Sequence, residues 1–171
     1  NKTRSIDIER WSKVLKAVTR LGIKPVIVRD TAMAFDQPIF KDYLEAPVAS
    51  IHLPFRIALY ERALMNFTRN NGPSTLLLYG KSHSMFFNKF DESFFPTSKQ
   101  WFALNYGMVE GSQYPMTTTR TNFVWDSEDP VKISAVLENL KRSPTIAADL
   151  HGFLNKKNAI ISYQTALRHL V

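Results

Sequence analysis

The last third of the chain, residues 124–171, predicts three consecutive short helices. The first begins around Asp126-Ser-Glu-Asp-Pro130, because serine and acidic side chains cap a helix start and proline suits the first helical position. The second follows Ser143-Pro144 by the same signals. From Asn158, apolar side chains repeat at helical spacing up to the last residue: Ile160, Tyr163, Leu167 and Leu170. This stripe predicts a helix that either docks on a partner or folds back on its own domain.

The size and composition of the chain exclude several classes of protein. With 171 residues it is long enough for one domain with a core, or for a compact domain followed by a helical extension. Hydrophobic residues make up 44% and charged residues 22%, which argues against a disordered chain. The absence of cysteine excludes a disulfide scaffold and a cysteine-based zinc site. No apolar run approaches the roughly 20 residues that span a bilayer, so we expect a globular protein with no membrane partner.

The positive charge is concentrated at the N-terminal end. The whole chain has a net charge of +7, and residues 1–29 alone contain eight Lys or Arg residues against two acidic ones. A cluster of this kind attracts anions and is typical of a protein that binds a phosphate backbone. A solvated basic helix face with no ligand is the alternative reading, and the sequence leaves it open.

Helix and strand signals alternate through the first two thirds of the chain. An amphipathic, basic helix covers 8–21, with Asp7 or Ser5 as its cap and Gly22 at its end, and it leads into a strand of the buried type over Pro25–Val28. Further expected elements, in chain order, are a loop and helix over 31–43, a loop or edge strand over 46–54, a helix over 55–68, a strand over 74–79, a helix face with Phe86, Phe90 and Phe94, a strand over 101–106 and a hairpin turn or bulge over 107–111. This alternation predicts an α/β (α+β) fold, a βαβ-type domain with a mixed sheet packed by helices.

Residues 84–102 are rich in aromatic side chains, which form either a core cluster or a platform on which bases stack. We favour a core cluster, because single-strand binders interleave aromatic residues with Lys and Arg, and only Lys89 and Lys99 are interleaved here.

The sequence holds no strong catalytic motif. Gly80-Lys81-Ser82 has Thr75 where a phosphate loop needs its first glycine, and the four histidines are scattered without metal-ligand spacing. Asp30, followed by Asp36 and Asp42, is the best enzymatic candidate, but carboxylates at such positions are more often caps than general bases. We therefore expect no catalytic residue, no metal and no cofactor.

Four segments, taken in order, resemble the family of the large-subunit ribosomal stalk-base protein L-ten, and its mitochondrial branch more than its bacterial one. They are the helix-turn-strand Leu21–Thr31, the Gly-Pro step with the hydrophobic run Gly72–Gly80, the Gly-containing segment Phe102–Gly111, and the acidic helix with its Ser-Pro-Thr step and Leu-x-Gly-x-Leu segment between Asp126 and Asn155. The chain departs from the family at Arg29-Asp30, where a basic-Asn pair is usual. That places a carboxylate where an amide faces RNA.

The resemblance implies an rRNA-binding domain over 1–125 and, over 126–171, a helical extension that holds the stalk dimers for recruitment of translation factors. It also implies neighbouring large-subunit proteins as partners, and a location on the ribosome of the mitochondrial matrix, with the cytoplasm as the alternative. The residues expected to contact rRNA are Lys13, Lys16, Arg20, Lys24, Arg29 and Thr31. Those expected to contact the stalk dimers are Ile160, Tyr163, Leu167 and Leu170.

A second hypothesis from another functional class is an α/β enzyme of the amino-acid-kinase-like type that acts on a small anionic substrate. The helix-strand unit at Leu21–Val28 suits its first element. Only six glycines are present, however, and no Gly-rich loop follows a strand to bring backbone N–H groups to a nucleotide phosphate. The scaffold is therefore the preferred expectation.

Overall fold

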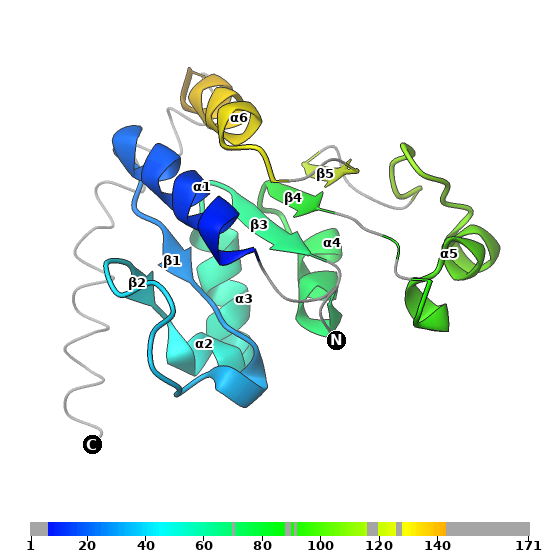
Figure 1. The fold of residues 1–171 in the computed structure, drawn as a ribbon, viewed down its shortest axis with the longest axis horizontal. Coiled ribbons are helices and arrows are strands. Elements are labelled where there is room, and N and C mark those ends of the chain that lie inside the picture. Colours follow the sequence, from blue (N-terminus) through cyan, green and yellow to red (C-terminus); the bar gives the residue numbers. More distant parts are fainter. Residues whose placement is uncertain are drawn as a thin grey trace. The chain divides into compact units, whose positions relative to one another are not determined.

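The structure is a computed structural model, which describes residues 7–69, 71–87, 90, 92–115, 120–125 and 128–142. In this part of the chain it is a mixed α/β fold with α-helices α1 to α6 and two small parallel sheets, so the predicted fold class is confirmed (Figure 1). Residues up to Pro130 belong to one compact unit, and a second unit begins at Val131. The domain boundary predicted between 125 and 126 stays a prediction.

Helix α1 (Ile8–Arg20) is the first described element, and it forms where the sequence predicts it. The Asp7 carboxylate accepts a hydrogen bond from the Arg10 backbone N–H at 3.0 Å, which caps the helix start. Its apolar stripe is buried through Val14, Leu15 and Val18. The turn that follows needs the positive φ of Gly22, which is +73°. The predicted cap, helix and glycine turn are therefore confirmed.

The strand expected over Pro25–Val28 is present as β1 (Val26–Ile27), which pairs in parallel with β2 (Leu44–Glu45). The expectation that it is of the buried type is wrong, because Val26 is 40% exposed. In the described structure, β1 and β2 form a sheet of only two strands. Such a small sheet buries few of its side chains.

The remaining elements of the first unit alternate short helices with short strands. They are the 3₁₀ helix η2 (Thr31–Met33), α2 (Pro47–Ile51), α3 (Leu53–Arg62), β3 (Asn66–Arg69), η3 (Gly72–Ser74), α4 (Thr75–Tyr79), β4 (Ser84–Phe87), η4 (Phe95–Thr97), α5 (Lys99–Tyr106) and β5 (Thr121–Val124).

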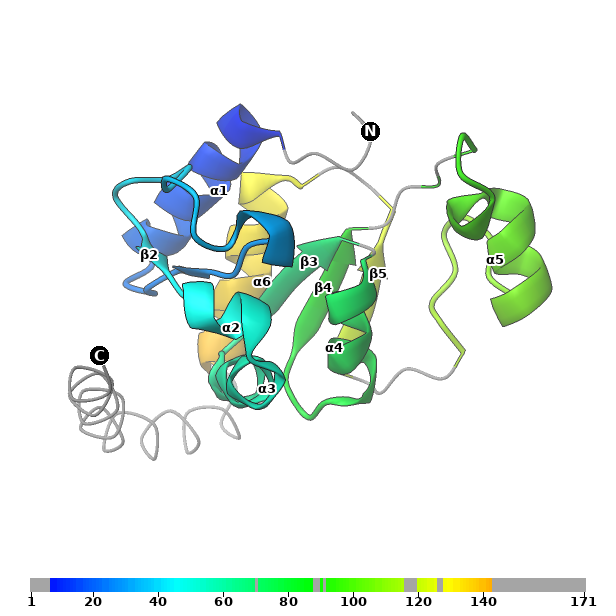
Figure 2. The ribbon, with the colours of Figure 1, turned by 90° about the horizontal axis from the view of Figure 1, so that it is seen from below.

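The larger sheet is parallel with the strand order β3-β4-β5, and β4 is its buried centre. Successive side chains of a strand point to opposite faces, so Phe86 and Phe87 lie on different sides. Phe86 belongs to an aromatic core whose other buried members are Leu77, Phe102, Met108, Tyr114 and Phe123. On the other face, the ring of Trp11 from α1 meets Phe87 edge-on at a centroid distance of 6.2 Å. The sheet therefore separates α1 from α4 (Figures 1 and 2).

Helix α6 (Pro130–Arg142) begins at the proline that the sequence marks as a helix start, and its Ile133 and Leu137 are buried. It is almost entirely within the second unit. The two helices predicted after Ser143, including the terminal stripe, lie outside the described residues.

Two predicted strands are wrong, since both segments are helical. Residues 74–79 belong to η3 and α4, which begin at a capping box in which Asn71 and Ser74 bond to each other's backbone N–H groups. Residues 101–106 lie in α5, between the Ser98 cap and the left-handed Gly107. Short apolar runs fit a buried helix as well as a strand, and here the capping residues decide the outcome.

Other expected boundaries also differ from the structure. The helix predicted over 55–68 ends at Arg62, and β3 follows. The helical spacing of the phenylalanines after position 84 is misleading, because Phe86 lies in strand β4. The segment 31–43 holds a single 3₁₀ turn, and 46–54 holds the helix α2. The segment 107–111 contains positive-φ glycines at both ends, but it follows a helix and is neither the hairpin turn nor the strand bulge that we expected.

Candidate nucleic-acid interface

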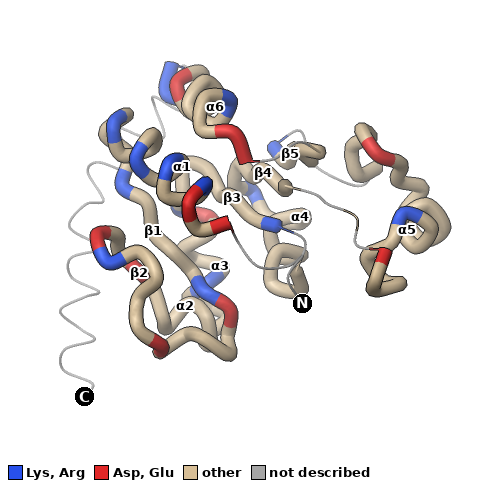
Figure 3. Tube along the Cα trace, in the orientation of Figure 1, with Lys and Arg blue, Asp and Glu red and all other residues tan. Residues whose placement is uncertain are grey.

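Helix α1 exposes a row of cations on the side opposite its buried stripe. Lys13, Lys16 and Arg20 are spaced by three and four residues, so they lie along one side of the helix. Lys24 follows after the glycine turn, and all four side chains belong to exposed residues. We call these four residues the basic face. Figure 3 shows the blue positions that run along α1.

The four cations of the basic face differ in how free they are. The Lys13 ammonium is 2.7 Å from the Glu9 carboxylate, one helical turn earlier. Lys16, Arg20 and Lys24 have no ion-pair or hydrogen-bond partner in the described part of the chain. Lys16, Arg20 and Lys24 can therefore bind an anion directly. Lys13 must first break its ion pair with Glu9, and breaking an exposed ion pair costs little free energy in water.

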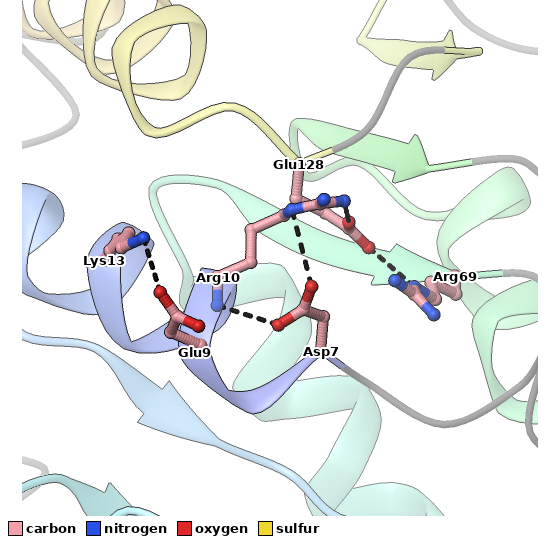
Figure 4. Close-up of polar contacts among 6 residues, drawn as sticks. All are labelled: Asp7, Glu9, Arg10, Lys13, Arg69 and Glu128. Carbon is pink, nitrogen blue, oxygen red and sulfur yellow. Dashed lines mark hydrogen bonds and ion pairs between the residues drawn. The ribbon is translucent and has the colours of Figure 1, made fainter.

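A buried carboxylate fixes the start of α1 against the sheet (Figure 4). Glu128 is 2% exposed, and its two oxygens lie 2.6 Å from Arg69 Nε, at the end of β3, and 3.6 Å from Arg10 Nη1, on α1. Burial alone would raise the pKa of Glu128, but the hydrogen bond from Arg69 and the charges of both arginines outweigh it and lower that pKa. The basic face is therefore held on a helix that is anchored at its first turn.

Arg29 does not join the basic face. Its side chain is 6% exposed, and Nη1 donates to the carbonyl oxygens of Asp36 at 2.8 Å and Gln37 at 3.1 Å. The same nitrogen lies 3.4 Å from the buried Glu45 carboxylate. These internal acceptors leave Arg29 with a role in shaping the segment after β1, contrary to the expectation that it binds a phosphate.

Thr31 is likewise used inside the protein. Its hydroxyl donates to the Ser50 carbonyl oxygen at 2.9 Å, although the residue as a whole is exposed. Of the six residues predicted to contact RNA, the structure thus places Lys13, Lys16 and Arg20 on one side of α1, leaves Lys24 exposed after it, and turns polar groups of Arg29 and Thr31 toward the chain itself. The four residues predicted to bind stalk dimers, Ile160, Tyr163, Leu167 and Leu170, lie outside the described residues.

Asp30, which the sequence suggests as the best candidate for a catalytic carboxylate, has a structural role. The Asp30 carboxylate accepts a hydrogen bond from the Ala32 backbone N–H at 3.0 Å and so caps η2. Ser82, from the segment that partly resembles a phosphate loop, is buried and accepts a hydrogen bond from the Asn66 amide at 3.0 Å. Within the described ranges, no group of three or more His, Cys, Asp and Glu side chains is arranged to hold a metal ion.

The aromatic residues between 84 and 102 belong largely to the core, as expected. Phe86, Phe87 and Phe102 are buried. Phe94 and Phe95 are exposed, but the neighbouring Lys99 is paired with Glu110 at 2.9 Å. A base-stacking platform combines aromatic rings with free cations, so this segment is a weaker candidate for RNA than the basic face.

Sequence reasoning missed Glu128 as a functional support, since it read residues 126–130 only as a helix start. Its partner Arg69 is 59 residues away in the sequence, and no local sequence pattern reveals such a pairing.

No family model matches the chain, and no curated protein and no solved structure matches it either. No helix in the described ranges is long and apolar enough to cross a membrane.

Proposed function

We propose that this protein is a non-catalytic scaffold of the large ribosomal subunit, of the stalk-base type and of the mitochondrial ribosome, which anchors the stalk dimers to rRNA. The observation that carries the RNA half of the proposal is the basic face. Lys16 and Arg20 lie on an anchored helix, and Lys24 follows just after the turn that ends it. All three are exposed and have no ion-pair or hydrogen-bond partner in the described structure. Cations in this arrangement neutralise backbone phosphates without reading base identity.

The enzyme alternative has less support from the geometry. The carboxylate best placed for catalysis, Asp30, is engaged as a helix cap. Arg29, which could have bound an anionic substrate at the end of β1, is engaged by Asp36, Gln37 and Glu45. A scaffold that binds a polyanion through an exposed helix needs neither a free Asp30 nor a free Arg29. The internal bonds of both residues therefore agree better with the scaffold than with the enzyme.

A salt titration of binding to purified large-subunit rRNA tests the RNA half. Replacing Lys16, Arg20 and Lys24 by Gln in one variant should weaken binding and reduce the slope of log K against log salt by up to about 0.9 for each phosphate that is no longer neutralised. The matched control replaces Lys41, Arg62 and Lys81 by Gln, which removes the same charge from other exposed residues. Equal effects in both variants would mean that net charge alone drives binding and that the basic face is not the interface.

The stalk half of the proposal concerns residues outside the described ranges and rests on the sequence stripe Ile160, Tyr163, Leu167 and Leu170. We expect that deleting 157–171 abolishes co-purification of the stalk proteins and leaves rRNA binding unchanged. The melting temperature should also stay nearly the same. A truncated chain that loses several degrees in its midpoint would show that this segment belongs to the protein's own core.

A further inference from the structure

The segment after β1 presents apolar side chains to solvent, whereas the sequence predicts RNA contacts there through Arg29 and Thr31. Between residues 30 and 42, which we call the acidic loop, Phe35 is 72% exposed, and Met33 and Ile39 are also exposed. Ala34 and Phe40 of the same loop are buried. The loop is thus attached to the core through Ala34 and Phe40, while the apolar side chains of Met33, Phe35 and Ile39 remain outside.

Hydrogen bonds to neighbouring elements hold the acidic loop in this conformation. Arg29 binds the carbonyl oxygens of Asp36 and Gln37, and its guanidinium is in turn paired with the buried Glu45. The hydroxyl of Thr31 binds the Ser50 carbonyl oxygen, and the Ser50 hydroxyl binds the Arg29 carbonyl oxygen at 2.9 Å. The exposed phenylalanine is therefore presented on a preorganised backbone, which lowers the entropy cost of binding.

The charges of the acidic loop indicate what kind of molecule covers it. Asp30, Asp36 and Asp42 are exposed, and their carboxylates have no cationic partner in the described part of the chain. Lys41 is the single cation of the loop. Three carboxylates around exposed apolar side chains repel a phosphate backbone and favour a partner with Lys or Arg. In Figure 3 the red positions of this loop contrast with the blue positions on α1.

We propose that the acidic loop is a docking surface for a basic protein segment, which inserts Phe35 into an apolar pocket and places Lys or Arg side chains beside Asp36 and Asp42. Aromatic anchors surrounded by charges are typical of protein–protein interfaces. The surface is separate from the basic face, so the protein has one face for a polyanion and another for a polycation. This inference does not depend on the proposed function.

A defined probe tests the proposal: a short amphipathic helical peptide made only of leucine and lysine, titrated into the full chain and followed by fluorescence anisotropy. Because the chain has a net charge of +7, binding of a cationic peptide requires a local acidic site. Phe35→Ala should weaken binding about tenfold or more, as expected of an anchor residue, and Asp36→Asn with Asp42→Asn should also weaken it. The matched control is Phe95→Ala, which removes an exposed phenylalanine elsewhere and should change the affinity less than about twofold.

The following results would contradict the proposed docking surface. Absence of peptide binding, or equal losses of affinity in Phe35→Ala and Phe95→Ala, would overturn the proposal. A loss of rRNA affinity in Phe35→Ala would identify the acidic loop as part of an RNA interface and would also overturn it. The salt slope of rRNA binding depends on Lys16, Arg20 and Lys24, so the two functions fail or succeed separately.

Discussion

The side-chain amide of Gln113 binds both backbone polar groups of Phe123 on the outer edge of the larger sheet. Its Nε2 donates to the Phe123 carbonyl oxygen at 2.9 Å, and its Oε1 accepts from the Phe123 N–H at 2.7 Å. Phe123 lies in β5, which ends the strand order β3-β4-β5 among the described strands. An amide in this position takes the place of a neighbouring strand and protects an edge that could otherwise pair with another chain.

The first prediction concerns this edge. Gln113→Ala should lower the free energy of unfolding by about 1–2 kcal/mol, since it removes two hydrogen bonds to the Phe123 backbone. It should also increase concentration-dependent aggregation, because the edge of β5 is opened. Gln100→Ala, at an exposed glutamine on α5, is the control in denaturant titrations and light scattering. If the two variants behave alike, the Gln113 amide does not protect the edge.

The second prediction follows from the lowered pKa of Glu128. A carboxyl group whose pKa is lower in the folded state contributes stability above its unfolded pKa and loses it as the pH falls through the folded value. Stability should therefore decline in the acid range below the ordinary pKa of glutamate. Glu128→Gln should remove part of this decline, and it should destabilise the protein by about 2–4 kcal/mol at neutral pH, since Arg69 and Arg10 each lose the charged carboxylate that they share.

Denaturant titrations from pH 3 to pH 7 check this prediction, with Glu61→Gln as the control at an exposed carboxylate. A Glu128→Gln protein whose stability keeps the full acid dependence of the parent would show that the decline comes from other groups.

The elements predicted correctly are those whose local signals agree with one another. Helix α1 has a capping aspartate, an apolar stripe and a terminating Gly22, and all three point to the same structure. Helix α6 begins at Pro130 for a similar reason. The errors fall on short apolar segments, where length does not separate a helix from a strand. For α5 the decisive signal was the Ser98 cap, and for α4 it was the Asn71 cap of the preceding η3; the hydrophobic pattern obscured both.

The candidate site was predictable where it depends on helical spacing and not where it depends on distant partners. Lys13, Lys16 and Arg20 could be placed opposite the buried stripe from the sequence alone. The carboxylate partner of Arg29 is Glu45, 16 residues away in β2, and nothing in the local sequence distinguishes an arginine that binds its own chain from one that binds a phosphate.

The third prediction separates these two roles of arginine. Arg29→Gln should lower the melting temperature, because it removes bonds to Asp36 and Gln37 and leaves Glu45 buried without a cation. Its rRNA salt slope should match the parent protein. Arg20→Gln should show the opposite pattern, with a smaller slope and only a small drop in melting temperature, since a cation in the last turn of α1 interacts favourably with the helix dipole. Thermal unfolding and salt titrations of both variants check this, and a reduced slope in Arg29→Gln would return Arg29 to the interface.

The fourth prediction uses the ion pair on the basic face itself. Glu9 lies 2.7 Å from Lys13 and lowers the positive charge at that end of the row. Glu9→Gln frees Lys13, so rRNA binding should become tighter and the salt slope should steepen by up to about 0.9 if Lys13 then meets a phosphate. Replacing Lys16 by Gln should have the opposite effect, weaker binding and a smaller salt slope. The free energy of unfolding should fall by about 0.3–1 kcal/mol, since a first-turn carboxylate interacts favourably with the dipole of α1. Thermal unfolding measures this loss. Glu61→Gln makes the same change in net charge away from α1. If its effect on the slope equals that of Glu9→Gln, the gain comes from overall charge and Lys13 does not bind a phosphate.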